Sequence, residues 1–128
     1  MTKKILIVED EIPVLDLLLT VFELEGYEVL SAKNGEEALR ISKELNPDIL
    51  ILDKLLPDID GIEVCASLKS DKTTSHQKIL ILSGVSQDHN IREAYRVKAD
   101  AYMTKPFGIK KLVGKVEELL DNQDQQVT

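Results

Sequence analysis

Short apolar runs alternate with longer amphipathic segments along the whole chain. Residues 5–8 (ILIV), 49–52 (ILIL) and 79–82 (ILIL) are continuous apolar runs, and residues 101–103 (AYM) form a weaker one. Runs of this kind are typical of parallel strands that are covered on both faces. Residues 28–32 are more mixed, as expected for a strand at the edge of a sheet. The pattern therefore predicts five strands.

Apolar residues recur at helical spacing after each predicted strand. The first helix is expected to start near Pro13 and to stop near Gly26, and Asn34 is the expected N-cap of the second. The other three apolar stripes begin at residues 62, 91 and 109. Strands and helices thus alternate, which predicts an α/β domain with a doubly wound, five-stranded parallel sheet between two helix layers.

Composition and charge narrow the class of protein. The 128 residues are enough for one domain, and 43% hydrophobic with 30% charged residues is typical of a soluble globular protein. The net charge of −7 argues against nucleic-acid binding by this domain alone. Glu9 and Asp10 interrupt the first apolar run too early for a signal peptide, so no membrane association and a cytoplasmic location are expected.

Cys65 is the only cysteine, which excludes an internal disulfide. Residues 1–121 are expected to form the domain and residues 122–128 a polar tail or the start of a linker.

Candidate chemistry gathers at the ends of the predicted strands, where open parallel sheets bind their ligands. The first strand ends in Glu9 and Asp10, the third in Asp53 and the fourth in Ser83, and Lys105 follows the fifth. Any one of the carboxylates has an ordinary explanation as a helix cap or a turn residue. Together they would repel one another without a cation, and an all-oxygen set of ligands favours Mg²⁺, which commonly shares its site with phosphate oxygens. Lys105 and Ser83 suit a phosphoryl group, as a positive charge and a hydrogen-bond donor.

Four motifs stand at these strand ends in chain order: ED (9–10), LD followed by LPDIDG (52–61), LSG (82–84) and YMTKPF (102–107). With them the chain resembles the receiver domain of two-component response regulators over nearly its whole length. The resemblance implies a flavodoxin-like sheet with strand order 2-1-3-4-5. It also implies a signalling module that is not an enzyme in the usual sense.

The resemblance assigns roles to individual residues. Asp53 becomes the phosphoacceptor, a carboxylate nucleophile that takes a phosphoryl group from a histidine kinase or phosphotransfer protein. Asp10, Asp53 and the main-chain carbonyl of Leu55 become direct Mg²⁺ ligands, and Glu9 acts on the metal mainly through water. Lys105 is expected to neutralise phosphoryl charge.

Further roles implied by the resemblance concern the switch. Ser83 corresponds to the hydroxyl residue that moves toward the phosphoryl group, and Tyr102 to the aromatic residue whose orientation follows. A cis peptide is expected between Lys105 and Pro106. Lys54 has no assigned role, and its place on a strand predicts a side chain that points away from Asp53, toward a partner or solvent.

Three hypotheses about function remain, and they differ in the chemistry assigned to the residues at the strand ends. The favoured one is a phosphorylation-controlled module that acts on a downstream target or output domain through the last two helices, with a phosphorylation-dependent homodimer as a further expectation. A receiver-like interaction module that works without phosphorylation is the alternative, although none of the acidic residues or the lysine is missing. A flavodoxin-like flavin carrier would need a phosphate-binding loop where the sequence has EDEIP, which would repel phosphate without a metal. Apolar Leu55 and Val85 are further expected to lengthen the life of the phosphorylated state.

Overall fold

The computed structural model of the protein describes residues 2–84 and 88–125, with ten elements that alternate as predicted. No helix in these residues is long and apolar enough to cross a lipid bilayer. The strands and helices are β1 (Lys4–Val8), α1 (Ile12–Leu24), β2 (Glu28–Ala32), α2 (Gly35–Leu45), β3 (Ile49–Asp53), α3 (Gly61–Ser70), β4 (Lys78–Ser83), α4 (Asp88–Arg96), β5 (Ala101–Thr104) and α5 (Ile109–Gln125).

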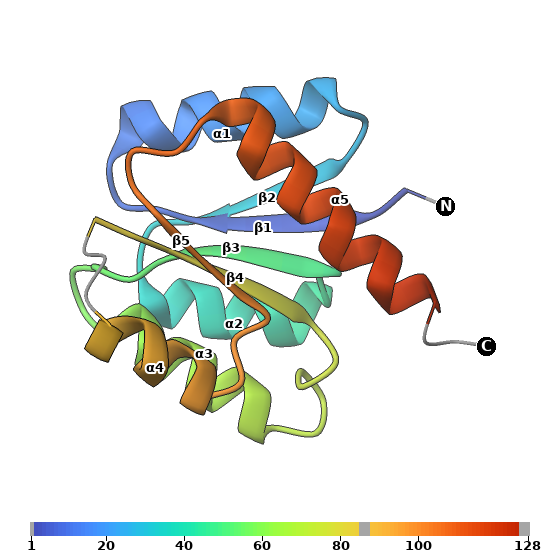
Figure 1. The fold of residues 1–128 in the computed structure, drawn as a ribbon. Coiled ribbons are helices and arrows are strands. Elements are labelled where there is room, and N and C mark those ends of the chain that lie inside the picture. Colours follow the sequence, from blue (N-terminus) through green and yellow to red (C-terminus); the bar gives the residue numbers. More distant parts are fainter. Residues whose placement is uncertain (1, 85–87, 126–128) are drawn as a thin grey trace.

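The five strands form one parallel sheet in the order β2-β1-β3-β4-β5 (Figure 1). This confirms the predicted fold class and strand order. The register aligns Val8 with Leu52, Asp53 with Leu82 and Ser83 with Thr104. Because all strands run in one direction, their carboxyl ends meet at one edge of the sheet.

Helices cover both faces of the sheet, with α1 and α5 on one side and α2, α3 and α4 on the other (Figure 1). Successive residues of β1 enter different cores, because side chains alternate across a strand. Ile5 and Ile7 pack with α1 and α5, whereas Leu6 and Val8 pack with α2, α3 and α4. All four are buried, and full burial of one such side chain contributes roughly 1.5–3 kcal/mol. The continuous apolar runs in the sequence are thus explained by a sheet that has no solvent-facing side at its centre.

Helix ends largely follow the signals in the sequence. Pro13 lies in the first turn of α1, and the Asn34 side chain caps α2 by accepting a hydrogen bond from the Glu37 N–H (2.8 Å). Helix α5 runs to Gln125, four residues past the predicted domain boundary at residue 121. Part of the segment expected to be a tail therefore has helical backbone, and the division into domain and tail stays a prediction.

The single cysteine lies inside the core that α2, α3 and α4 form with the sheet. Cys65 is fully buried, and burial raises the pKa of its thiol to about 12. The thiolate is the reactive form of cysteine, so this residue is an inert packing element.

Candidate functional site

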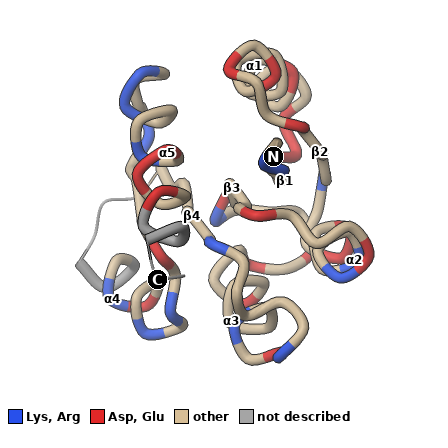
Figure 2. The backbone as a smooth tube through the Cα atoms, turned by 90° about the vertical axis from the view of Figure 1, so that its right-hand side faces the viewer, with Lys and Arg blue, Asp and Glu red and all other residues tan. Residues whose placement is uncertain are grey.

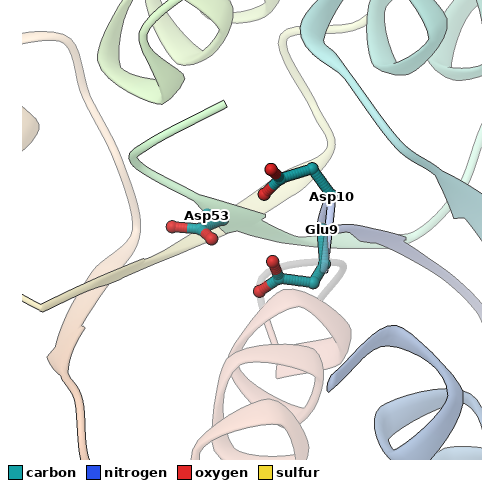
Figure 3. A group of neighbouring side chains, drawn as sticks. All are labelled: Glu9, Asp10 and Asp53. Atoms are coloured by element: carbon teal, nitrogen blue, oxygen red, sulfur yellow. The ribbon is translucent and has the colours of Figure 1, made fainter. Parts of the chain in front are cut away.

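Three carboxylates meet where β1 and β3 end. Glu9 and Asp10 follow β1 directly, and Asp53 is the last residue of β3. One carboxylate oxygen from each lies within 4.8 Å of the others, and Figure 3 shows the side chains of Glu9 and Asp10 beside that of Asp53. Glu9 and Asp53 are buried and Asp10 is exposed. The cluster thus has a buried floor and one side open to solvent.

Lys105 places one positive charge against this cluster. Its Nζ lies 3.2 Å from Asp53 Oδ2 and 3.5 Å from Glu9 Oε1. Burial alone would lower the pKa of Lys105, but the charges of Asp53 and Glu9 and the hydrogen bonds to them outweigh burial and raise it. Lys105 is therefore held in its charged form.

Burial makes the negative charge of Glu9 unfavourable in this cluster. Glu9 is only 1% exposed. Burial, together with the nearby charge of Asp53, raises the pKa of its carboxyl to about 7. The Glu11 N–H, which donates to Glu9 Oε2 (3.1 Å), and the charge of Lys105 act in the opposite direction without cancelling the shift. An additional cation at this position would relieve the repulsion.

The donor set indicates which cation fits. Fully ionised, the three carboxylates carry two negative charges more than Lys105 neutralises. Every donor is an oxygen, and one side of the cluster is open to water. Hard divalent ions such as Mg²⁺ take one or two protein carboxylates and retain several waters, so the residues present fit Mg²⁺.

Backbone hydrogen bonds fix the segments that carry the site. The Lys54 N–H donates to the Leu82 carbonyl (2.8 Å), and the Lys105 N–H donates to the Ser83 carbonyl (2.7 Å). The Leu55 N–H donates to Asp53 Oδ1 (3.1 Å), which orients the carboxylate from its own loop. Asp53 is thus held by β4 on one side and by the turn that follows it on the other.

The structure also places the residues expected to form the switch. Ser83 is fully buried at the end of β4, next to Thr104 of β5. Tyr102, half-buried on β5, packs against the core under α4 and lines a hollow of about 510 Å³ together with Lys111 and Lys115. The peptide bond between Lys105 and Pro106 is cis, as the resemblance implies. Val85, expected to influence the phosphorylated state, lies outside the described residues.

Lys54 differs from its expected placement. Its side chain is only 14% exposed, and Nζ forms an ion pair with Asp60 Oδ2 at 2.9 Å. The prediction of a solvated side chain is therefore wrong, and a partner-facing role stays a prediction. Sequence reasoning overlooked Asp60, whose signal was an opposite charge six residues after Lys54 across a turn containing Pro57.

Comparison with known proteins gives one family. The family model for the response regulator receiver domain matches residues 5–117. The chain is 39% identical over 120 residues to the alkaline phosphatase synthesis transcriptional regulatory protein PhoP of Bacillus subtilis, covering 94% of this chain and 49% of that protein. It is 36% identical over 118 residues to the phosphate regulon transcriptional regulatory protein PhoB of Pseudomonas aeruginosa, covering 92% of this chain and 52% of that protein. The chain therefore spans about half the length of these regulators.

A solved structure agrees over nearly the full length. The response regulator receiver domain protein (CheY-like) from Methanospirillum hungatei superimposes with a TM-score of 0.93 at 30% identity, covering 98% of this chain and 99% of that one. The similarity includes all ten elements, because coverage is almost complete in both directions. In this shared receiver-domain fold, the acidic cluster lies at the carboxyl ends of β1 and β3.

Proposed function

The chain belongs to the response regulator receiver domain family of two-component signalling, and from this premise we propose that Asp53 is its phosphoacceptor. The chain is a signalling module and not a conventional enzyme. The observation that carries the proposal is the ion pair of the Asp53 carboxylate with Lys105 at 3.2 Å, beside the Glu9–Asp10 pair at one sheet edge. An acidic cluster of this kind is typical of the Mg²⁺ site of receiver domains.

The proposed reaction is transfer of a phosphoryl group to a carboxylate oxygen. Receiver domains are phosphorylated by histidine kinases, and we assign that class of donor, or a phosphotransfer protein, to this chain. An Asp53 oxygen attacks phosphorus, an O–P bond forms, and the P–N bond to the donor histidine breaks. The histidine nitrogen keeps the electron pair of that bond. The product is an acyl phosphate on Asp53.

Residues around Asp53 supply positioning and charge stabilisation. Lys105 neutralises the charge of the arriving phosphoryl oxygens, having been paired with Asp53 beforehand. Ser83 is the proposed hydroxyl donor to the product, and Tyr102 is the proposed residue that reports its movement. The switch then shifts the population between an inactive and an active conformer.

The proposed Mg²⁺ ligands are Asp10, Asp53 and the Leu55 main-chain carbonyl, with Glu9 acting through water. When bound, the ion neutralises phosphoryl oxygen charge and offsets the repulsion among the carboxylates. Glu9, which is buried, contributes charge without needing direct contact with the phosphoryl group.

The proposed output surface lies on α4 and α5. Figure 2 shows Lys and Arg on both helices, whereas α1 has acidic residues and no basic ones. The hollow that Tyr102 lines with Lys111 and Lys115 connects α5 to the proposed switch residue. A downstream protein target or an output domain is the proposed partner, and residues 1–121 are the proposed extent of the receiver domain.

Phosphorylation in vitro tests the proposal. The purified protein with Mg²⁺ and acetyl phosphate is expected to gain the mass of one phosphoryl group. With EDTA in place of Mg²⁺ the gain should fall to background, because Lys105 alone leaves the cluster with excess negative charge. Intact-protein mass spectrometry measures both. No gain with acetyl phosphate or phosphoramidate would overturn the proposal in favour of an interaction module that works without phosphorylation.

A further inference from the structure

We propose that Lys54 is a positioning residue for the Mg²⁺ site, acting through its ion pair with Asp60. This inference rests on the proposed function of Asp53 and Leu55 and extends it to a residue with no assigned role. Lys54 joins Asp53 to Leu55 in the chain, so a shift of the Lys54 backbone moves both proposed ligands.

The loop that follows Asp53 is closed by contacts at its two ends. The Gly61 N–H donates to the Lys54 carbonyl (2.7 Å), and the side chains of Lys54 and Asp60 meet at 2.9 Å. Residues 54 and 61 are thus joined through the backbone, and residues 54 and 60 through an ion pair. The turn containing Leu55 is enclosed by these contacts.

The two carboxylate oxygens of Asp60 accept hydrogen bonds from different groups. Oδ1 accepts a hydrogen bond from the Ile62 N–H (2.8 Å) and caps α3, while Oδ2 accepts from Lys54. The ion pair therefore couples the end of β3 to the start of α3. The loop of residues 54–60 connects these two elements.

Apolar packing holds Leu56 and Ile59 of this loop against the core, but it does not hold Leu55. The Leu55 side chain is 63% exposed, so it contributes little burial to fix its own backbone. Farther along, the Asp58 carboxylate accepts from the Gly35 and Glu36 N–H groups (2.8 and 3.0 Å), which tethers the middle of the loop to α2. Two polar contacts lie next to Leu55, which are the hydrogen bond from its own N–H to Asp53 Oδ1 and the adjacent Lys54–Asp60 ion pair.

A mostly buried lysine is seldom placed for stability alone. An apolar residue of similar size is often at least as stabilising as a buried ion pair. Lys54 is 14% exposed and Asp60 39%, so the pair is partly desolvated. A role in fixing the geometry of the adjacent ligands explains why a charge pair stands there.

Calorimetric titration with Mg²⁺ tests this role without requiring phosphorylation. Lys54→Met is expected to weaken Mg²⁺ binding about tenfold, as loss of supporting contacts around metal ligands commonly does. Hydrogen exchange at the Gly61 amide should accelerate in the same variant, because the loop closure is loosened. Lys54→Arg, which keeps the charge and can pair with Asp60, should restore most of the affinity.

Two controls separate positioning from simple charge. Lys72→Met removes an exposed lysine and corrects for the change in net charge. If Lys54 acted only through its charge, Lys54→Met would strengthen Mg²⁺ binding, which is the opposite sign and would overturn the inference. Asp60→Asn keeps the cap oxygen but removes the ionic partner, so Lys54→Met combined with Asp60→Asn should weaken binding no more than Lys54→Met alone.

The outcomes also separate this inference from the proposed function. If the wild-type protein is phosphorylated and Lys54→Met binds Mg²⁺ with unchanged affinity, only the positioning role is overturned. If Lys54→Met weakens Mg²⁺ binding but no donor phosphorylates the wild-type protein, only the phosphoacceptor proposal is overturned.

Discussion

The Asp53→Ala protein is expected to take up no phosphoryl group from acetyl phosphate at any Mg²⁺ concentration. Asp53 supplies the nucleophilic oxygen, and Ala has no group to replace it. Glu9 is a poor substitute, because it is only 1% exposed and its carboxylate is not open to a phosphodonor. Intact-protein mass spectrometry over a time course should show the unmodified mass throughout.

The matched control is Asp16→Ala, which removes an exposed carboxylate from α1, outside the acidic cluster. Its phosphorylation should follow that of the wild-type protein. Thermal unfolding of both variants checks that the fold is retained. An Asp53→Ala protein that is folded and still gains one phosphoryl group would assign the nucleophile to another residue.

Gly61→Ala is expected to destabilise the protein by about 3 kcal/mol, the upper range for forcing an extra carbon into a well-packed site. The added Cβ would lie 2.4 Å from the Asp53 carbonyl oxygen and 2.8 Å from Lys54 Cα. Both neighbours are backbone atoms of the segment that carries the phosphoacceptor, so they cannot move without moving Asp53. The free energy of unfolding, from urea denaturation, measures the loss.

Gly114→Ala provides the comparison within the same chain. Gly114 is exposed in α5, and an added Cβ meets no described atom within 4 Å. Alanine has the higher helix propensity, so this variant should be more stable than wild type by about 0.5–1 kcal/mol. Equal stabilities for the Gly61 and Gly114 variants would show that the close approach at Gly61 does not constrain the loop.

The fold was predictable because its main signals are local. Continuous apolar runs such as residues 49–52 identify a sheet that is covered on both faces, and Pro13 and Asn34 mark helix starts correctly. The parallel arrangement puts Glu9, Asp10 and Asp53 at the same edge of the sheet, and the pairing of β1 with β3 brings them together. The strand order came from the resemblance to a known family, since the periodicity of a strand does not specify its neighbours.

The supporting contacts could not be predicted in the same way. Strand alternation predicted a Lys54 side chain that points away from Asp53, toward a partner or solvent. That alternation holds only while the strand continues. Lys54 follows the last residue of β3, where the chain turns and returns to it at Gly61. The partner of such a residue depends on the path of the loop, and loop geometry is not encoded in hydrophobic periodicity.

Charge balance at the site was only partly visible in the sequence. Repulsion among the carboxylates was expected, and so was the approach of Lys105. The burial of Glu9 was not, because a carboxylate that directly follows a strand has no periodic signal for its exposure. Its 1% exposure is what raises its pKa and separates it from Asp10, its exposed neighbour in the chain.

The most direct test of the central claim is chemical mapping of the phosphorylated residue. Protein phosphorylated with acetyl phosphate and Mg²⁺ is reduced with sodium borohydride, which converts an aspartyl phosphate to homoserine, and its peptides are then sequenced by mass spectrometry. We predict homoserine at position 53 and at no other aspartate. Homoserine at Asp10 or at any other aspartate, with Asp53 unmodified, would contradict the assignment of Asp53 as the phosphoacceptor.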